Sequence, residues 1–217
     1  MRIYEDRYSR ERLRFQLALR FIRLEARTHT IRQWTGLSDD RIRKLYRSYL
    51  AHSSRALPRH RGKSPQRVGI FLRSARLRQE SSLLATLFRL LGALPMSSAP
   101  PSLPGVRVAR AAGLPSPPQA QLLCEAYELY RTLLGAPALG FEHAVFLLQA
   151  LRDADEITTD HCPECQALVV ADRWALFAPR CFPCAQVGAV DQAEHSRARS
   201  SAADPSAASL GTPAPTL

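Results

Sequence analysis

Four of the five cysteines in this 217-residue chain stand as two pairs near its C-terminal end. Cys162 and Cys165 form one Cys-x-x-Cys pair, and Cys181 and Cys184 form another after fifteen intervening residues. A two-residue gap lets both thiolates of a pair reach one metal ion from a tight turn, and two such turns supply the corners of a tetrahedron. The spacing therefore predicts one structural zinc ion, with four sulfur ligands and no coordination position left open for water.

Other interpretations of the cysteines stay open beside the zinc site. His161 precedes the first cysteine and competes for a ligand role, and ordinary buried or redox-active thiols are the alternative to metal binding. Disulfides are rare in a reducing compartment, which favours metal ligands. Cys124 stands alone on the apolar face of a predicted helix and is expected to be a core thiol. Residues 167–178, between the pairs, alternate weakly and predict a short hairpin that packs on the cysteine turns.

The charge of the chain points to a polyanionic partner. The formal charge is +11 and the pI is about 10.2, which favours nucleic acid over a neutral ligand. Residues 41–78 hold twelve cations and no aspartate or glutamate, whereas a solvated helix face normally mixes both signs. A phosphate backbone is the expected counterion, and we expect this segment to lie along DNA. The candidate DNA contacts are the first eight of these cations: Arg41, Arg43, Lys44, Arg47, Arg55, Arg59, Arg61 and Lys63.

The basic segment begins inside a pattern typical of a helix-turn-helix. Helical periodicity covers residues 10–27 and 28–34, and a third helix is expected from a cap at Ser38 to about residue 50, after a turn at Gly36. Arg32 stands where such motifs usually have a small residue, and a plain helical hairpin is the alternative. The third helix is predicted to bury Ile42, Leu45, Tyr46 and Tyr49. Its outward side chains, suited to phosphates and guanine edges, are Arg41, Arg43, Lys44, Arg47 and Ser48.

The remaining pattern predicts a mainly α fold: a helical domain with an N-terminal helix-turn-helix-like unit and a small C-terminal four-cysteine zinc module. We expect a basic helical region over 1–94, a proline-rich linker over 95–118, a helical hairpin plus the zinc module over 119–192, and a disordered tail over 193–217. Within these, helices are expected at 68–94, 119–134 and 141–153. The chain shows neither a signal peptide nor an apolar run of about eighteen residues, so we expect a soluble, cytoplasmic protein without a membrane partner.

Two long runs and the cysteine quartet resemble a known family. The runs are "QLALRFIRLEARTHTIRQWTGLSDDRIRKLYRSYL" and "EAYELYRTLL". Together they resemble FlhC, the zinc-containing subunit of the FlhD–FlhC regulator of bacterial flagella, over about residues 12–187. The resemblance implies a DNA-binding transcriptional activator of flagellar genes that acts in a hetero-oligomer with FlhD, binds flagellar promoters and recruits RNA polymerase. The stretch "KSPQRVGIFLRSARLRQ" lacks the tryptophan usual in the family, and the proline-rich segment looks inserted, which is typical of a divergent member.

Two other classes of function compete with a DNA-binding regulator. A nucleic-acid-processing enzyme would need catalytic groups, and the sequence shows no phosphate-binding glycine loop, no paired His–Glu motif for a catalytic metal and no nucleophile with an evident base. We therefore expect a protein that is not an enzyme. A zinc-ribbon interaction protein that does not bind DNA directly is the other alternative, and binding to promoter DNA distinguishes it from an activator.

Overall fold

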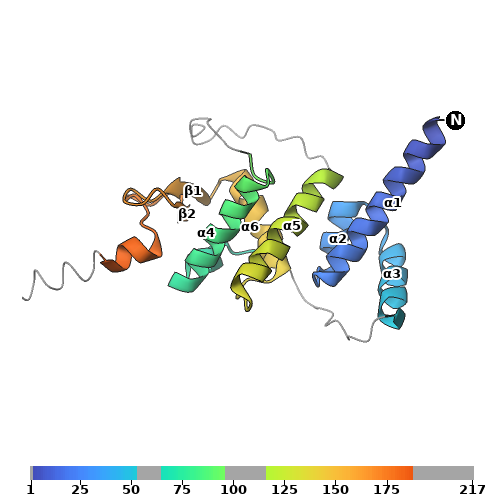
Figure 1. Ribbon diagram of the computed structural model, residues 1–217, viewed down its shortest axis with the longest axis horizontal. Coiled ribbons are helices and arrows are strands. Elements are labelled where there is room, and N and C mark those ends of the chain that lie inside the picture. The colour runs from blue at the N-terminus through green and yellow to red at the C-terminus, as the bar shows by residue number, and fades with distance from the viewer. Residues whose placement is uncertain (1, 53–64, 96–115, 188–217) are drawn as a thin grey trace, which may run out of the picture.

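The computed structural model describes residues 2–52, 65–95 and 116–187, and these segments are mostly helical (Figure 1). The predicted mainly α class, with a cysteine cluster near the C-terminal end, is confirmed. Among the described helices, none is both long enough and apolar enough to cross a lipid bilayer. The elements are α1 (Arg2–Arg23), α2 (Thr28–Thr35), α3 (Asp39–His52), the 3₁₀ helix η1 (Val68–Leu72), α4 (Ala75–Leu90), α5 (Pro117–Leu134), α6 (Phe141–Asp153), β1 (Ile157–His161) and β2 (Leu168–Asp172).

Helices α1, α2 and α3 pack around a small apolar centre. Phe21, Ile31 and Ile42 contribute one fully buried side chain from each helix. The turn between α2 and α3 needs Gly36, whose φ of 70° lies in the left-handed region and whose N–H donates to the carbonyl oxygen of Arg32 at 2.9 Å. Only three residues separate the two helices, so the predicted corner is present in the structure.

Helix α5 begins inside the segment predicted as linker. The prediction placed residues up to 118 in the linker, but Pro117 and Pro118 form the first turn of α5. Proline is accepted there because its missing N–H would have no partner within the helix and its fixed φ suits the first turn. The N–H of Ser116 donates to the side-chain oxygen of Gln119 at 3.3 Å, which closes this helix start. Residues 96–115 of the predicted linker and the predicted tail lie outside the described residues.

The periodic stretch predicted as one helix over 68–94 is divided in two. Its first five residues form η1, and α4 starts after Ser74, whose side-chain oxygen accepts the N–H of Leu77 at 3.2 Å. A serine cap satisfies one of the free N–H groups at a helix start, so the chain can turn before it resumes a helical path. Helix α4 ends at Leu90, ahead of Gly92 at a φ of 78°.

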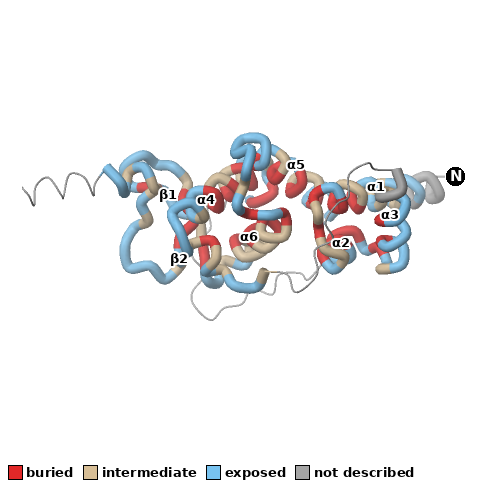
Figure 2. The backbone as a smooth tube through the Cα atoms, turned by 90° about the horizontal axis from the view of Figure 1, so that it is seen from below, coloured by how far each residue is buried: buried red, intermediate tan, exposed pale blue. Residues whose placement is uncertain are grey.

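The helices before and after the proline-rich segment share one core. Helix α4 packs against α5, α6 and β2, and the buried side chains of all these elements form one cluster with those of α1 to α3. Figure 2 shows buried residues along the backbone of both parts. Arg20 of α1 holds Glu128 of α5 through two hydrogen bonds of 2.8 and 2.6 Å. Glu142 of α6 accepts the backbone N–H of Arg27 at 2.8 Å and the hydroxyl of Thr30 at 2.9 Å. The N-terminal unit is thereby fixed to the rest of the molecule.

Candidate metal centre and basic helix

The first cysteine pair is the turn of the β-hairpin. Strands β1 and β2 pair antiparallel, with His161 opposite Leu168, so the chain between them carries Cys162 and Cys165. The N–H of Cys162 donates to the carbonyl oxygen of Ala167, and the N–H of Gln166 donates to that of Cys162, both at 2.9 Å. These bonds close the tight turn that places both sulfurs on one side.

The hairpin predicted over residues 167–178 is therefore wrong in its position. Only its first part forms a strand, β2, and the partner strand β1 precedes the cysteines. Strand β1 has the β-branched sequence Ile157-Thr158-Thr159, which suits a strand, whereas residues 173–178 form an exposed connection to the second cysteine pair. The paired strands rest on α4, because the N–H of Val170 donates to the Ser82 hydroxyl at 3.0 Å.

The second cysteine pair lies at the start of a helical turn. Cys181 precedes helical residues 182–187, and its carbonyl oxygen accepts the N–H of Ala185 at 3.0 Å. The guanidinium of Arg180 lies 3.2 Å from the carboxylate of Glu164, which sits within the first pair. This ion pair joins the two cysteine turns, so the arrangement is held by more than the sulfurs.

The structure brings the four predicted ligands together. The sulfurs of Cys162, Cys165, Cys181 and Cys184 all lie within 4.8 Å of one another, and those of Cys165 and Cys181 are 3.4 Å apart. These separations exceed a disulfide bond of about 2.05 Å, so the cysteines are free thiols. A tetrahedron built on zinc–sulfur bonds of about 2.3 Å has edges of about 3.8 Å, comparable to this cluster. The four cysteines can hold a metal ion.

Thiols within the cluster differ in pKa. Hydrogen bonds from the backbone N–H groups of Cys181 and Cys165 lower the pKa of Cys162 to about 6. The pKa of Cys184 is raised, first by its contacts with the sulfurs of Cys181 and Cys165. Four adjacent thiols cannot all ionise without a compensating cation, and a metal ion supplies that charge.

His161, the competing ligand candidate, and Cys124, the predicted core thiol, both lie outside the cluster. The metal-capable cluster found in the described residues contains cysteines alone, and His161 instead has its Nδ1 3.0 Å from the carbonyl oxygen of Gln166. Cys124 is fully buried on α5, and its burial raises its pKa to about 12. Cys124 is the core thiol that the sequence predicted. A protonated, inaccessible sulfur is also a poor nucleophile.

Helix α3 has the two faces that the sequence predicted. Ile42 and Tyr46 are buried, and Leu45 and Tyr49 are half-buried against the core. The hydroxyl of Tyr46 donates to the carbonyl oxygen of Ala26 at 2.8 Å, which fixes α3 to the connection between α1 and α2. The opposite face, which we call the α3 basic face, exposes Arg41, Arg43, Lys44, Arg47 and Ser48.

Two of the four basic side chains on this face already have carboxylate partners. Arg41 contacts Glu11 at 2.8 Å and lies 5.8 Å from the centre of the Phe15 ring, and Arg43 contacts Asp40 at 3.1 Å. For Lys44 and Arg47 the described part of the chain shows no carboxylate partner. The exposed Arg32 pairs with Asp39 at 3.7 Å, so its length does not disturb the corner. The other candidate contacts, Arg55, Arg59, Arg61 and Lys63, lie outside the described residues.

The described cations of residues 41–78 lie in separate parts of the molecule, because α3 carries four of them and the others are on or beside η1 and α4. Helix α3 lies at one end of the molecule and α4 lies beyond α5 (Figure 1). Arg76 and Arg78 serve local structure, since Arg76 binds Glu80 and the carbonyl oxygen of Ala136, and Arg78 donates to the carbonyl oxygen of Leu72 at 2.9 Å. The expectation that residues 41–78 lie along DNA stays a prediction, and among the described residues its cations divide between α3 and the region of η1 and α4.

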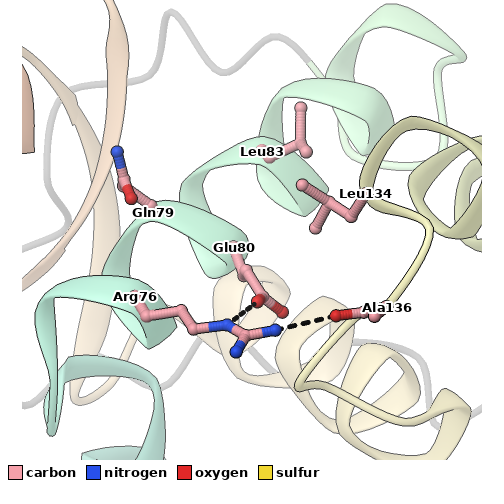
Figure 3. Close-up of a pocket in the computed structure, with 6 residues that line it drawn as sticks. All are labelled: Arg76, Gln79, Glu80, Leu83, Leu134 and Ala136. Carbon is pink, nitrogen blue, oxygen red and sulfur yellow. Dashed lines mark hydrogen bonds and ion pairs between the residues drawn. The ribbon is translucent and has the colours of Figure 1, made fainter.

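A pocket of about 440 Å³ beside α4 contains a buried carboxylate that the sequence analysis missed (Figure 3). Glu80 accepts hydrogen bonds from Arg76 Nε at 2.8 Å, from the N–H of Ala138 at 2.8 Å and from the hydroxyl of Tyr130. Glu80 precedes Leu84 by four residues and so lies on the apolar face of α4. A carboxylate on an apolar face is the sequence signal that could have identified it. These contacts join α4 to the connection between α5 and α6, so the carboxylate has a structural role.

Comparison with known proteins does not identify the chain. None of the protein-family models matches it, and the search of curated proteins also found no match.

Proposed function

We propose that this protein is a DNA-binding transcriptional activator of flagellar genes that contains one structural zinc ion and acts in a hetero-oligomer with an FlhD-type subunit. The observation that carries the proposal is the α3 basic face, which stands opposite a buried stripe at the second helix of a three-residue corner. The resemblance of residues 12–187 to FlhC supports the choice of promoters, of the FlhD-type partner and of RNA polymerase as the recruited enzyme.

Zinc is the metal that fits the cysteine cluster best. Four thiolates at tetrahedral spacing are the usual ligand set of a structural zinc site, and backbone N–H groups already hydrogen bond to the Cys162 sulfur. When bound, zinc would supply folding energy and no open coordination position. The four cysteines would hold the hairpin and the second cysteine turn together, and the hairpin transmits that rigidity to α4 through Val170 and Ser82.

The α3 basic face would enter the major groove of DNA. Among the described residues Lys44 and Arg47 have no carboxylate partner to leave before they reach phosphates or base edges, whereas Arg41 and Arg43 must exchange Glu11 and Asp40 for DNA. Arg41 and Arg43 therefore contribute less net affinity for DNA than their charge suggests. Each cation that neutralises a phosphate steepens the logarithmic salt dependence by about 0.9.

Contacts on its buried side fix the position of α3. A helix must have a fixed position if its side chains are to recognise a DNA sequence. Tyr46 fixes α3 to the preceding connection, and the contacts of Arg20 with Glu128 and of Glu142 with Thr30 fix the N-terminal unit to α5 and α6. A helix held in this way pays little ordering cost when it binds. The outward side chains then keep one orientation relative to the rest of the complex.

Co-expression with a candidate FlhD-type protein tests the proposal. The purified complex should bind a flagellar promoter duplex in a fluorescence anisotropy titration, and should bind a scrambled duplex of equal length at least tenfold more weakly. The chain alone should bind the promoter less tightly than the complex does. A stable complex that shows no preference for the promoter would support the alternative of an interaction protein without direct DNA binding and would contradict the proposal.

A further inference from the structure

Three large apolar side chains project into solvent from the connection between β2 and the second cysteine pair. Trp174, Leu176 and Phe177 are 63%, 92% and 85% exposed. Aromatic side chains commonly bury about 150–250 Å² each in cores and interfaces, so their shared exposure leaves a large apolar area in water. Large exposed apolar areas mark interaction sites more often than apolar residues scattered singly do, and these three side chains lie within four residues of one another. We call residues 173–180 the aromatic loop.

The aromatic loop is held in place at both ends. At its start, the backbone N–H of Arg173 donates to the carbonyl oxygen of Glu156 at 2.9 Å, and its guanidinium binds the carbonyl oxygen of Ala154 and lies 5.5 Å from the Trp174 ring centre. The N–H of Trp174 donates to the Asp172 carboxylate at 2.8 Å. At its end, Arg180 pairs with a carboxylate in the first cysteine turn. A loop fixed in this way loses little freedom on binding.

The segment that carries the aromatic loop has a charge opposite to that of the whole chain. Residues 154–187 contain five carboxylates and two arginines, a formal charge of −3 in a chain of +11. Both arginines are already engaged by the contacts just described, and Arg89, which reaches the hairpin from α4, donates to the Thr159 hydroxyl. A divalent ion on four thiolates would add a further charge of −2. All five carboxylates are exposed: Asp155, Glu156, Asp160, Glu164 and Asp172.

We propose that the aromatic loop is the docking surface for a protein partner that presents an apolar helix face bordered by lysine and arginine. The three apolar side chains would pack on that face, and the surrounding carboxylates would pair with its basic border. Negative charge disfavours DNA here, although exposed aromatic rings also stack on single-stranded bases. The hairpin lies at the end of the molecule opposite α3, so this surface is separate from the α3 basic face and does not depend on DNA binding (Figure 1).

Fluorescence quenching of the full-length, zinc-loaded protein tests the docking surface. The chain has two tryptophans, and Trp34 is only 2% exposed, so neutral acrylamide quenches mainly Trp174. The probe is a synthetic amphipathic helix of leucine and lysine, and its control replaces every lysine by glutamate. The lysine peptide should protect Trp174 from acrylamide and shift its emission to shorter wavelength, and the glutamate peptide should do neither.

Variants distinguish docking from non-specific attraction. The double change Leu176→Ser and Phe177→Ser should weaken the lysine peptide at least tenfold, because side chains at the centre of an interface dominate its affinity. The matched control is Leu133→Ser on α5, a residue 63% exposed, which should leave the affinity unchanged. Equal zinc content in all variants confirms that the fold is retained. Protection of Trp174 by the glutamate peptide, or by single-stranded oligothymidylate, would overturn the proposal, as would unchanged affinity of the double variant.

Discussion

Replacing Glu80 by glutamine should weaken the contact between α4 and the connection that follows α5. The Glu80 carboxylate is 5% exposed and accepts hydrogen bonds from Tyr130, Arg76 and the N–H of Ala138. A hydrogen bond to a charged group contributes about 1.5–3 kcal/mol, but the side chain of Arg76 is 64% exposed, so its pairing contributes less than about 1 kcal/mol. Glutamine keeps one acceptor and turns an NH₂ group toward the remaining donors.

We expect Glu80→Gln to lower the free energy of unfolding by about 2–3 kcal/mol at pH 7, and Glu80→Ala to lower it by about 3–5 kcal/mol. Burial raises the pKa of Glu80, but the hydrogen bonds from Tyr130 and Arg76 outweigh it and hold the pKa below its ordinary value. The stabilisation is therefore complete above the unfolded pKa of about 4.3 and is lost as the pH falls through the folded pKa. The difference between wild type and Glu80→Gln should shrink below about pH 4.

Urea denaturation followed by circular dichroism measures these differences. The matched control is Glu125→Gln, the same chemical change at a carboxylate 46% exposed and 3.7 Å from Arg20, which should cost less than about 1 kcal/mol. Tyr130→Phe removes one donor from the same carboxylate and should cost about 1.5–3 kcal/mol. A Glu80→Gln protein within about 0.5 kcal/mol of wild type, or a difference that grows on acidification, would refute the structural role of this carboxylate.

Two further predictions concern the metal centre and the helical corner. Cys162→Ser should release the metal and abolish protection from hydrogen exchange in β1 and β2, because binding energy at such a site is folding energy. The control Cys124→Ser should retain the metal. Retained zinc in Cys162→Ser would contradict the four-cysteine site. Gly36→Ala should lower the free energy of unfolding by about 1 kcal/mol, because the φ of 70° strains any side chain there. The control is Gly69→Ala, at a glycine without positive φ. Equal losses of stability in thermal unfolding of the two variants would refute the role of the Gly36 backbone conformation.

Patterns that depend on local spacing were the most predictable from the sequence. The cysteine spacing identified the four sulfurs that the fold brings together, since the geometry of each pair is set by its own turn. Helical periodicity identified the buried stripe of α3 because burial on a helix follows a 3.6-residue period. The bounds of α6 were also predicted, from Phe141 to Asp153.

Features that depend on the path of the chain in space could not be predicted in the same way. The basic segment of residues 41–78 is continuous in sequence, but among the described residues its cations divide between α3 and α4, which lie in different parts of the molecule. The hairpin was predicted wholly after the first cysteine pair, but β2 pairs with β1, which precedes that pair. Pro117 and Pro118 indicated a linker, although proline is equally suited to the first turn of a helix. Each of these choices is decided by tertiary packing.

The salt dependence of DNA binding tests the proposed function most directly. The measurement compares two double variants. The α3 variant combines Lys44→Ala and Arg47→Ala, and the control combines Arg67→Ala and Arg73→Ala, which removes the same charge from exposed residues beside η1. In complex with the FlhD-type subunit, the α3 variant should lose about 1.8 from the slope of the logarithm of affinity against the logarithm of salt, and the control should lose less than about 0.9. Equal slopes in the α3 variant and wild type would contradict contact between α3 and DNA.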